Sequence, residues 1–273
     1  TPLPPLAVPT GTEVLARDGS LLRAFQVGDG LWRLAPPAEG IDPRFLQMLV
    51  AWEDRRFAAH KGVDPRAVIR AAAQGLRHGR IVSGASTLSM QTARLLERGP
   101  TADWHAKLRQ ARLAMALERR IGKDGIMALY LRLAPYGGNT EGVRAAALMW
   151  FGKEPTRLTP AEAALLAGIV KAPSACSPFE NPAQARKRRT YVLSRMEELG
   201  YLSEDEEANM RALPLPETRF SEADEYPWYR DEALRESCER LNVSADELLS
   251  GGYTIFTALN PKADFTGVAF PLP

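Results

Sequence analysis

The chain has 273 residues, 45% of them hydrophobic and 25% charged, with a net charge of +2 and an isoelectric point near 8.6. This length suffices for one well-buried core with a small appendage, and the composition is ordinary for a globular protein. So small a net charge gives no argument for a nucleic-acid partner, and we expect none. Because no apolar run reaches about 18 residues, we predict no membrane-spanning helix in this sequence.

The metal-binding residue types show no ligand spacing. The two cysteines, Cys176 and Cys238, are far apart in the sequence, and the three histidines, His60, His78 and His105, form no group. We therefore predict no metal site and take two free thiols as the default, with a single disulfide left open.

Secondary structure follows from turn and periodicity signals, taken in chain order. Residues 1–11 are rich in proline, and residues 12–25 are typical of a β-hairpin that turns at Asp18-Gly19. Apolar residues then recur at helical spacing from residue 43 to about 199. The helices predicted there cover 43–57, 65–77, 86–97, 102–121, 123–133 and 141–151, and further helices begin after Thr159, Asn181 and Ser203.

The last sixty residues differ in pattern. Residues 213–227 carry prolines and acids and are interpreted as a linker, followed by a short helix over 228–241 and an alternating strand over 251–259. The predicted fold is mainly α, a helical domain with an N-terminal β-hairpin and a short C-terminal linker with a strand. We assign residues 1–40 to a lead-in, 41–212 to the main domain and 213–273 to the linker.

An acid pair ends the first predicted helix. A partly desolvated carboxylate at Glu53 would gain basicity and could take a proton from a hydroxyl group. The alternative is a solvated acid pair, Glu53 and Asp54, beside Arg55 and Arg56. In the loop that follows, Gly62 permits a tight turn, and we expect His60 to hold the loop rather than to transfer protons.

The third predicted helix begins with hydroxyl residues and carries a cation further along. Ser86 and Thr87 follow Gly84, and Gln91 and Arg94 come later in the same helix. Free N–H groups and hydroxyls at a helix N-terminus favour an anion, although a simple N-cap would use the same residues.

The next helix is basic, with Lys107, Arg109, Arg112, Arg119 and Arg120. We select Lys107 as an anion ligand and interpret the other four as a solvated face. The sequence has no nucleotide-binding glycine loop, no nucleophile elbow and no serine followed three residues later by lysine, which argues against acyl transfer.

Together these segments resemble, in order, the five motifs of the family 51 glycosyltransferases, the peptidoglycan polymerases of class A penicillin-binding proteins. The matching residues are Glu53, Asp54, Phe57, His60, Gly62 and Asp64; then Gly84, Ser86, Thr87, Gln91 and Arg94; then Lys107, Ala114, Leu117 and Glu118; then 126–131; and last 161–168, 172–174, 181–182 and Arg189. The run 133–138 and the pair Met90-Gln91 resemble the 1C subtype. The chain departs from the wider family at Gln110, Arg132 and Ala106, where a glutamate, an asparagine and an arginine are usual.

The resemblance implies a lysozyme-like fold and an inverting polymerisation of lipid II in cell wall synthesis. Glu53 would be the catalytic base, and the substrate-binding residues would be Asp54, Phe57, His60, Ser86, Thr87, Gln91, Arg94, Lys107 and Gln110. No cofactor is required, and a divalent cation, Mg²⁺ or Mn²⁺, is allowed. A lysozyme-like enzyme that cleaves glycans and a lipid-pyrophosphate-binding module with little activity are the alternatives.

The resemblance also implies partners and a location. The partners would be lipid II, the growing glycan strand, cell-wall synthesis proteins and the membrane surface, on the outer face of the cytoplasmic membrane. The chain starts at Thr1 and shows no signal peptide, so we interpret it as a fragment without its anchor. Segment 62–83 mixes apolar residues with Arg66, Arg70, Arg77 and Arg80, which suits an interfacial surface, and an ordinary amphipathic core helix would have the same pattern.

Overall fold

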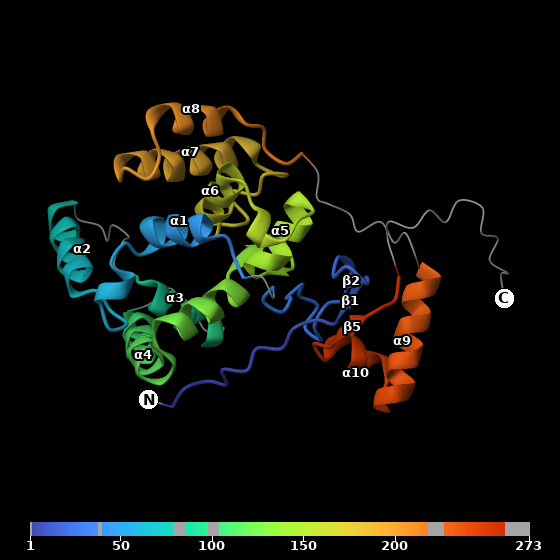
Figure 1. The fold of residues 1–273 in the computed structure, drawn as a ribbon. Helices are drawn as coiled ribbons and strands as arrows, with labels where there is room; N and C mark the ends of the chain where they lie inside the picture. The colour runs from blue at the N-terminus through green and yellow to red at the C-terminus, as the bar shows by residue number, and fades with distance from the viewer. Residues whose placement is uncertain (1, 38–39, 79–85, 98–103, 218–226, 260–273) are drawn as a thin grey trace. The chain divides into compact units, whose positions relative to one another are not determined.

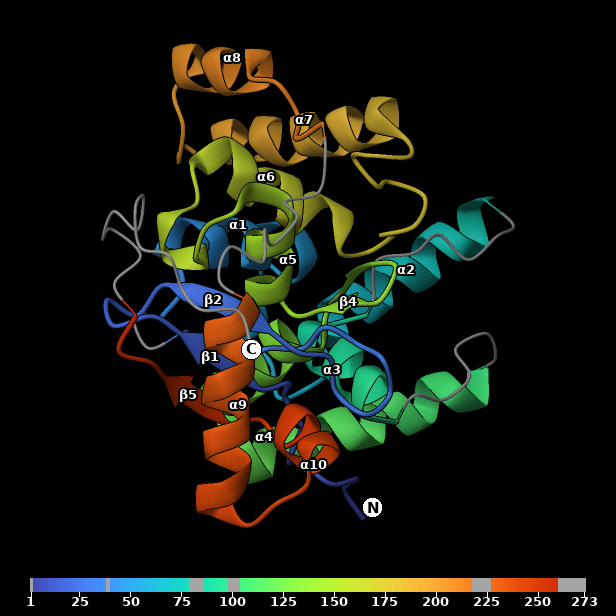
Figure 2. The same cartoon turned by 90° about the vertical axis from the view of Figure 1, so that its right-hand side faces the viewer.

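The computed structural model describes residues 2–37, 40–78, 86–97, 104–217 and 227–259. Its contacts divide the chain into a helical unit, residues 1–8 and 35–220, and a second unit, residues 9–34 and 221–273. The ribbon is shown in two views in Figure 1 and Figure 2, and the two units are described separately. The N-terminal hairpin and the C-terminal segment, which the sequence analysis placed in separate parts, belong to the same unit.

The helical unit consists almost entirely of helices, as the apolar spacing predicted. They are α1 (Pro43–Glu53), η1 (Phe57–Ala59), α2 (Pro65–His78), α3 (Leu88–Glu97), α4 (Trp104–Leu133), α5 (Val143–Phe151), η2 (Pro155–Arg157), α6 (Pro160–Ile169), α7 (Pro182–Glu198) and α8 (Glu204–Ala212). Their apolar faces enclose one core. The mainly α prediction is confirmed.

Helix α6 lies at the centre of this core, between α1 and α7. Thr159 begins it with a capping box, since its side chain accepts from the Glu162 amide and the Glu162 carboxylate accepts from the Thr159 amide. Nearly every residue of α6 is buried, which small side chains permit. At Gly168 an added Cβ would lie 3.1 Å from the carbonyl oxygen of Arg188 on α7, so this glycine sets how closely the two helices approach.

Helix α4 consists of two helical parts, as predicted, joined at a kink. Gly122 interrupts it with non-helical angles, φ 65° and ψ −171°, at the position of the expected boundary. The first part of α4 packs along α3, and the two are in extensive contact. Because α3 begins at Leu88 rather than residue 86, Thr87 precedes the helix and caps it by accepting from the Met90 amide.

The segment after α4, predicted as a loop, is a small hairpin. Strand β3 (Pro135–Gly137) pairs antiparallel with β4 (Thr140–Glu141). Gly142 follows with φ 90°, and a Cβ there would lie 2.8 Å from the Arg132 carbonyl oxygen, so α5 begins at Val143 instead of 141.

Helices α7 and α8 run side by side at the end of the helical unit (Figures 1 and 2). Arg189 of α7 is 2% exposed and donates to the carbonyl oxygens of Arg211, Leu213 and Pro214, which fixes the chain at the end of α8. Burial lowers the pKa of Arg189, and the charge of Arg186 lowers it further.

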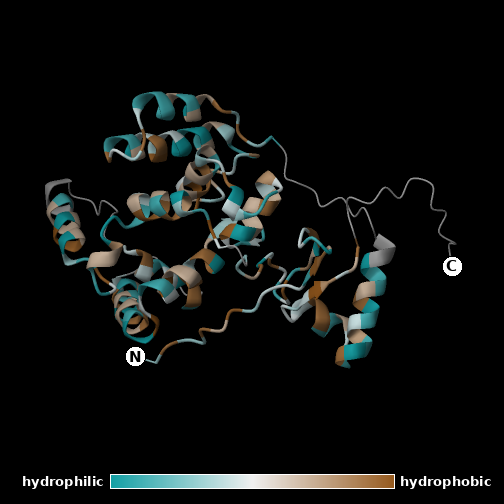
Figure 3. Cartoon of the chain, viewed as in Figure 1, coloured by the Kyte–Doolittle hydropathy of each residue, from teal (hydrophilic) through white to brown (hydrophobic). Residues whose placement is uncertain are grey.

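The second unit is built on a three-stranded sheet in the order β2-β1-β5. Strands β1 (Glu13–Leu15) and β2 (Leu21–Ala24) form the predicted hairpin, and β5 (Thr254–Phe256) pairs parallel with β1. Helices α9 (Pro227–Leu241) and α10 (Ala245–Ser250) complete the unit. Helix α9 is coloured mostly hydrophilic in Figure 3, and exposed ion pairs such as Arg240–Glu236 lie along it. The sequence predicted α9 and missed α10.

Candidate active site

The helical unit contains a cavity of about 720 Å³ between α1, α2, α3, α4 and the turn after α6. Most of the residues selected from the sequence line it: Glu53, Asp54, Ser86, Thr87, Gln91, Arg94, Lys107 and Gln110. Phe57 and His60 are not among its lining residues. Segments that are far apart in the sequence therefore supply one site.

Glu53, the last residue of α1, has an unusual environment for a carboxylate. Its side chain is 0% exposed, and its Oε2 accepts a hydrogen bond of 2.9 Å from Nε2 of Gln91. The ammonium of Lys171 lies 3.8 Å from the same oxygen. The other oxygen, Oε1, is buried and has no hydrogen-bond partner among the described residues. A buried carboxylate oxygen with unused accepting capacity can take a proton.

Two tyrosines lie close enough to Glu53 to feel its charge. Tyr130 and Tyr136 are each 2% exposed. Burial raises the pKa of both phenols far above the ordinary value, and the negative charge of Glu53 raises it further. Both hydroxyls therefore stay protonated well above neutral pH.

Three cations, Arg94, Lys107 and Lys171, line the same cavity as Glu53. Lys107 donates to Oγ of Ser86 at 3.1 Å. Partial burial lowers the pKa of Lys107, and the positive charges of Arg94 and Lys171 lower it further. The three cations are thus near enough to repel one another, and an anion placed among them would relieve that repulsion.

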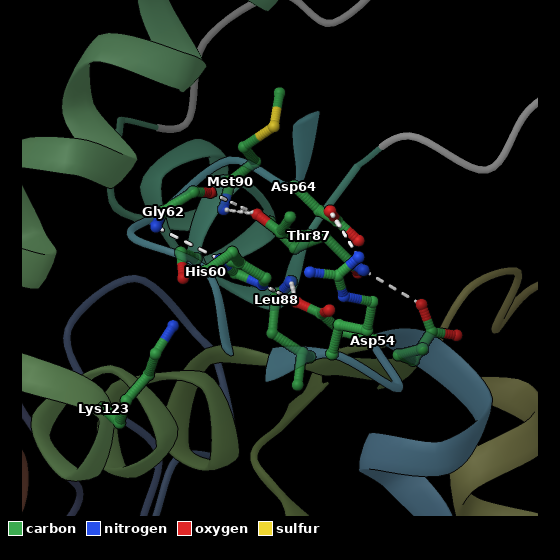
Figure 4. A network of polar contacts seen from close by, with 12 residues as sticks. Asp54, His60, Gly62, Asp64, Thr87, Leu88, Met90 and Lys123 are labelled. Atoms are coloured by element: carbon green, nitrogen blue, oxygen red, sulfur yellow. Dashed lines mark hydrogen bonds and ion pairs between the residues drawn. The ribbon is translucent and has the colours of Figure 1, made fainter. Parts of the chain in front are cut away.

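A polar network joins the end of α1 to the start of α3 (Figure 4). Asp54 is buried, and its Oδ2 accepts from the Leu88 amide at 2.9 Å and from Nε2 of His60 at 2.8 Å. Nδ1 of His60 accepts from the Gly62 amide at 3.2 Å, so the two ring nitrogens contact Gly62 and Asp54 at the same time. His60 holds this loop, as expected from the sequence.

The same junction has a second connection. Oγ1 of Thr87 donates a hydrogen bond of 2.6 Å to the carbonyl oxygen of Gly62. Nearby, the ammonium of Lys123 lies over the ring of Phe57, 4.4 Å from the ring centroid. Thr87 and Phe57 thus contact the protein itself in this structure. Their assignment as substrate-binding residues, like that of Asp54 and His60, stays a prediction.

The sequence analysis missed several residues of the cavity. Lys171 lies in the turn after α6 and reaches Glu53 only because α6 packs on α1. Arg55, Arg56 and Arg70 also line the cavity, and Arg56 pairs with Asp64 at 3.7 Å. No local pattern distinguishes such cations from solvated ones, because their place depends on packing.

Two further structural findings concern metals and membranes. The described residues contain no group of three or more histidine, cysteine, aspartate or glutamate side chains that could hold a metal ion. Among the helices in that part of the chain, none is long and apolar enough to cross a membrane.

Comparison with known proteins establishes the family. Residues 18–197 match the transglycosylase family. The chain belongs to this family, the peptidoglycan glycosyltransferase domains of class A penicillin-binding proteins, and the resemblance inferred from the motifs is confirmed.

The chain is similar to several penicillin-binding proteins. The chain is 42% identical to penicillin-binding protein 1C of Escherichia coli (strain K12) over 214 residues, which cover 78% of this chain and 28% of that protein. It is 32% identical to penicillin-binding protein 2D of Bacillus subtilis (strain 168) over 262 residues, which cover 95% of this chain and 38% of that protein. The crystal structure of penicillin-binding protein 1A from Haemophilus influenzae aligns with a TM-score of 0.46 at 21% identity, over 94% of this chain and 28% of that one. The chain thus spans roughly a third of the length of these relatives.

Proposed function

We propose that this domain polymerises lipid II, with Glu53 as the base. The observation that carries the proposal is the buried carboxylate of Glu53, in a cavity that also holds Arg94, Lys107 and Lys171, with one oxygen that no described residue contacts by a hydrogen bond. A base beside a cluster of cations suits a reaction that removes a proton from a hydroxyl group and releases an anion.

In the proposed step, the 4-hydroxyl oxygen of the incoming lipid II sugar forms a bond to the anomeric carbon of the growing strand. The bond from that carbon to undecaprenyl pyrophosphate breaks, and the leaving pyrophosphate takes the electron pair. Glu53 accepts the hydroxyl proton, and attack from the face opposite the leaving group inverts the configuration. Arg94, Lys107 and Lys171 would stabilise the charge that grows on the pyrophosphate.

The residues that line the cavity do not form a cage for a divalent cation. Each of the three carboxylates in the lining has at least one protein partner: Oε2 of Glu53 contacts Gln91 and Lys171, Oδ2 of Asp54 contacts His60 and Leu88, and Oδ1 of Asp64 contacts Arg56 and the Arg66 amide. Gln110 is neutral. A hard cation prefers several free carboxylate oxygens. Participation of Mg²⁺ or Mn²⁺ stays a prediction, and the proposed step does not pass through one.

The decisive test is product analysis with purified lipid II. The parent chain should give polymer, Glu53→Gln should lower turnover by about 10²–10⁴-fold, and Arg94→Ala should also lower turnover. A glycan-cleaving enzyme would instead shorten preformed strands and would hardly respond to Arg94→Ala. A binding module would retain lipid II without any product, an outcome that overturns the proposed activity.

Gln110 tests the departure from the wider family. Its side chain lines the cavity and is 2% exposed. If a missing carboxylate limits turnover, Gln110→Glu should raise polymerisation, most clearly with Mg²⁺ or Mn²⁺. A flat or lower rate would mean that this chain stabilises the leaving group by its own arrangement.

We also propose that the domain works against the outer face of the cytoplasmic membrane. The support is a set of exposed apolar side chains flanked by arginines: Val68 and Ile69 on α2, 44% and 69% exposed, and Trp104 and Leu108 on α4, 64% and 47% exposed. Mixed polar and apolar colouring along α2 is visible in Figure 3. Such surfaces bind anionic lipid.

Vesicle flotation tests this surface. The parent should float with vesicles that contain anionic lipid, and Ile69→Glu should float less. Phe256→Glu is a matched control, because Phe256 is 72% exposed in the second unit. Equal flotation of all three proteins would contradict the proposed surface. Association with cell-wall synthesis proteins stays a prediction.

A further inference from the structure

The contact between Gln91 and Glu53 joins two helices at the centre of the cavity. Nε2 of Gln91, on α3, lies 2.9 Å from Oε2 of Glu53, at the end of α1. An ionised carboxylate only accepts hydrogen bonds, so the amide must turn its NH₂ group toward Glu53. This orientation of the side-chain amide follows from the chemistry of the pair.

The two carboxylate oxygens differ as a result. Oε2 has a hydrogen bond from Gln91, whereas the buried Oε1 has none from the part of the chain that the structure describes. Lys171 also lies nearer Oε2, but its 3.8 Å separation is too long for a hydrogen bond, and its side chain is 49% exposed. Gln91 is therefore the side chain that restrains rotation of the carboxylate.

Geometry also separates Gln91 from the anion ligands. After donating one N–H to Glu53, the amide keeps one N–H and a carbonyl oxygen, and that oxygen repels a phosphate. Arg94, by contrast, has five N–H donors and no acceptor. The contact of Gln91 in the structure is thus directed at Glu53, and its role in substrate binding, which the resemblance implied, stays a prediction.

We propose that Gln91 is a positioning residue for the base. It holds Oε2, so that Oε1 is the atom left to accept the proton. This inference rests on the proposed function, in which Glu53 is the base. A glutamine at this site acts through Glu53 and needs no contact with the reacting atoms.

Two substitutions test the role. Gln91→Met keeps the length of the side chain and removes the donor, and Gln91→Glu places a second carboxylate against Glu53. Because both changes disfavour the ionised base, the acid limb of the pH profile of kcat should move to higher pH. We expect a shift of about one unit for Gln91→Met, from the loss of one hydrogen bond to a charged group, and a larger shift for Gln91→Glu. The KM for lipid II should change less than threefold.

Binding of inorganic pyrophosphate, measured by calorimetry, provides a readout that does not depend on turnover. Arg94→Ala should weaken it at least tenfold, while Gln91→Met should leave it within threefold of the parent. If Gln91→Met instead weakens pyrophosphate binding and raises KM with an unmoved acid limb, Gln91 is an anion ligand and the inference is wrong.

The two proposals fail in different ways. Absence of polymer from the parent chain would remove the proposed function, and with it the basis of this inference. Polymer from the parent, together with an unshifted pH profile in both Gln91 variants, would remove only the positioning role. Thermal unfolding of each variant shows whether a lost rate reflects a lost fold.

Discussion

Replacing Asp54 should destabilise the helical unit more than any loss of substrate contact would explain. The carboxylate accepts from the Leu88 amide and from Nε2 of His60, and all three residues are buried. Asp54→Ala leaves both donors without a partner. At about 1–3 kcal/mol for each buried donor left unsatisfied, the free energy of unfolding should fall by roughly 2–6 kcal/mol. Asp54→Asn should lose less, because both bonds share Oδ2 and one amide oxygen in its place can accept both.

Urea unfolding followed by far-UV circular dichroism measures this loss, because the helical unit gives most of the signal. Glu198→Gln is the control: Glu198 is 62% exposed and pairs with Arg195 at the surface, so it should change the free energy by less than about 1 kcal/mol. If Asp54→Ala and Asp54→Asn both stay within about 1 kcal/mol of the parent, the network does not hold the two motifs together and our reading of it is refuted.

Three other residues give further predictions. Gly62→Ala should lower the free energy of unfolding by about 2–5 kcal/mol, because Gly62 has φ +97° and an added Cβ would lie 2.7 Å from the backbone of Ala114. The control in the same urea titration is Gly28→Ala, since no described atom lies within 4 Å of a Cβ added there. The pKa of Lys107 is lowered, so this lysine loses its charge at a lower alkaline pH than an ordinary lysine, and the affinity for pyrophosphate, measured by calorimetry, should fall there. Lys107→Arg should move that fall to higher pH, because arginine keeps its charge. Identical pH profiles of affinity for the parent and Lys107→Arg would contradict this prediction. Arg189→Met removes the donor to three carbonyl oxygens and should speed amide hydrogen exchange in α8 at least tenfold. Unchanged exchange rates would show that packing alone holds α8.

Features that depend on neighbours in the sequence could be predicted. The capping box at Thr159 and Glu162 and the turn at Asp18-Gly19 both form where the residue types indicated. The break in α4 falls at Gly122, at the expected boundary between two helices. In each case the stabilising contact spans only a few residues, so the chain carries the whole signal locally.

Contacts between distant residues could not be predicted in the same way. Gln91 and Glu53 are 38 residues apart, and the motifs assigned each a separate role without indicating their hydrogen bond. Lys171 reaches Glu53 through the packing of α6 on α1, which no spacing reveals. The motifs thus predicted which residue types gather at the site, whereas their partners depend on tertiary packing.

The pairing of the second unit has a consequence for how the chain folds. Strand β1 lies between β2 and β5, and the bond from the Thr257 hydroxyl to the Leu15 carbonyl joins residues 242 positions apart. During synthesis, β1 can pair with β2 at once, but its other edge waits until the whole helical unit has emerged. An unpaired edge is a template for other chains. We therefore expect a fragment that ends at residue 217 to aggregate from its N-terminal hairpin, even with every residue of the candidate active site present.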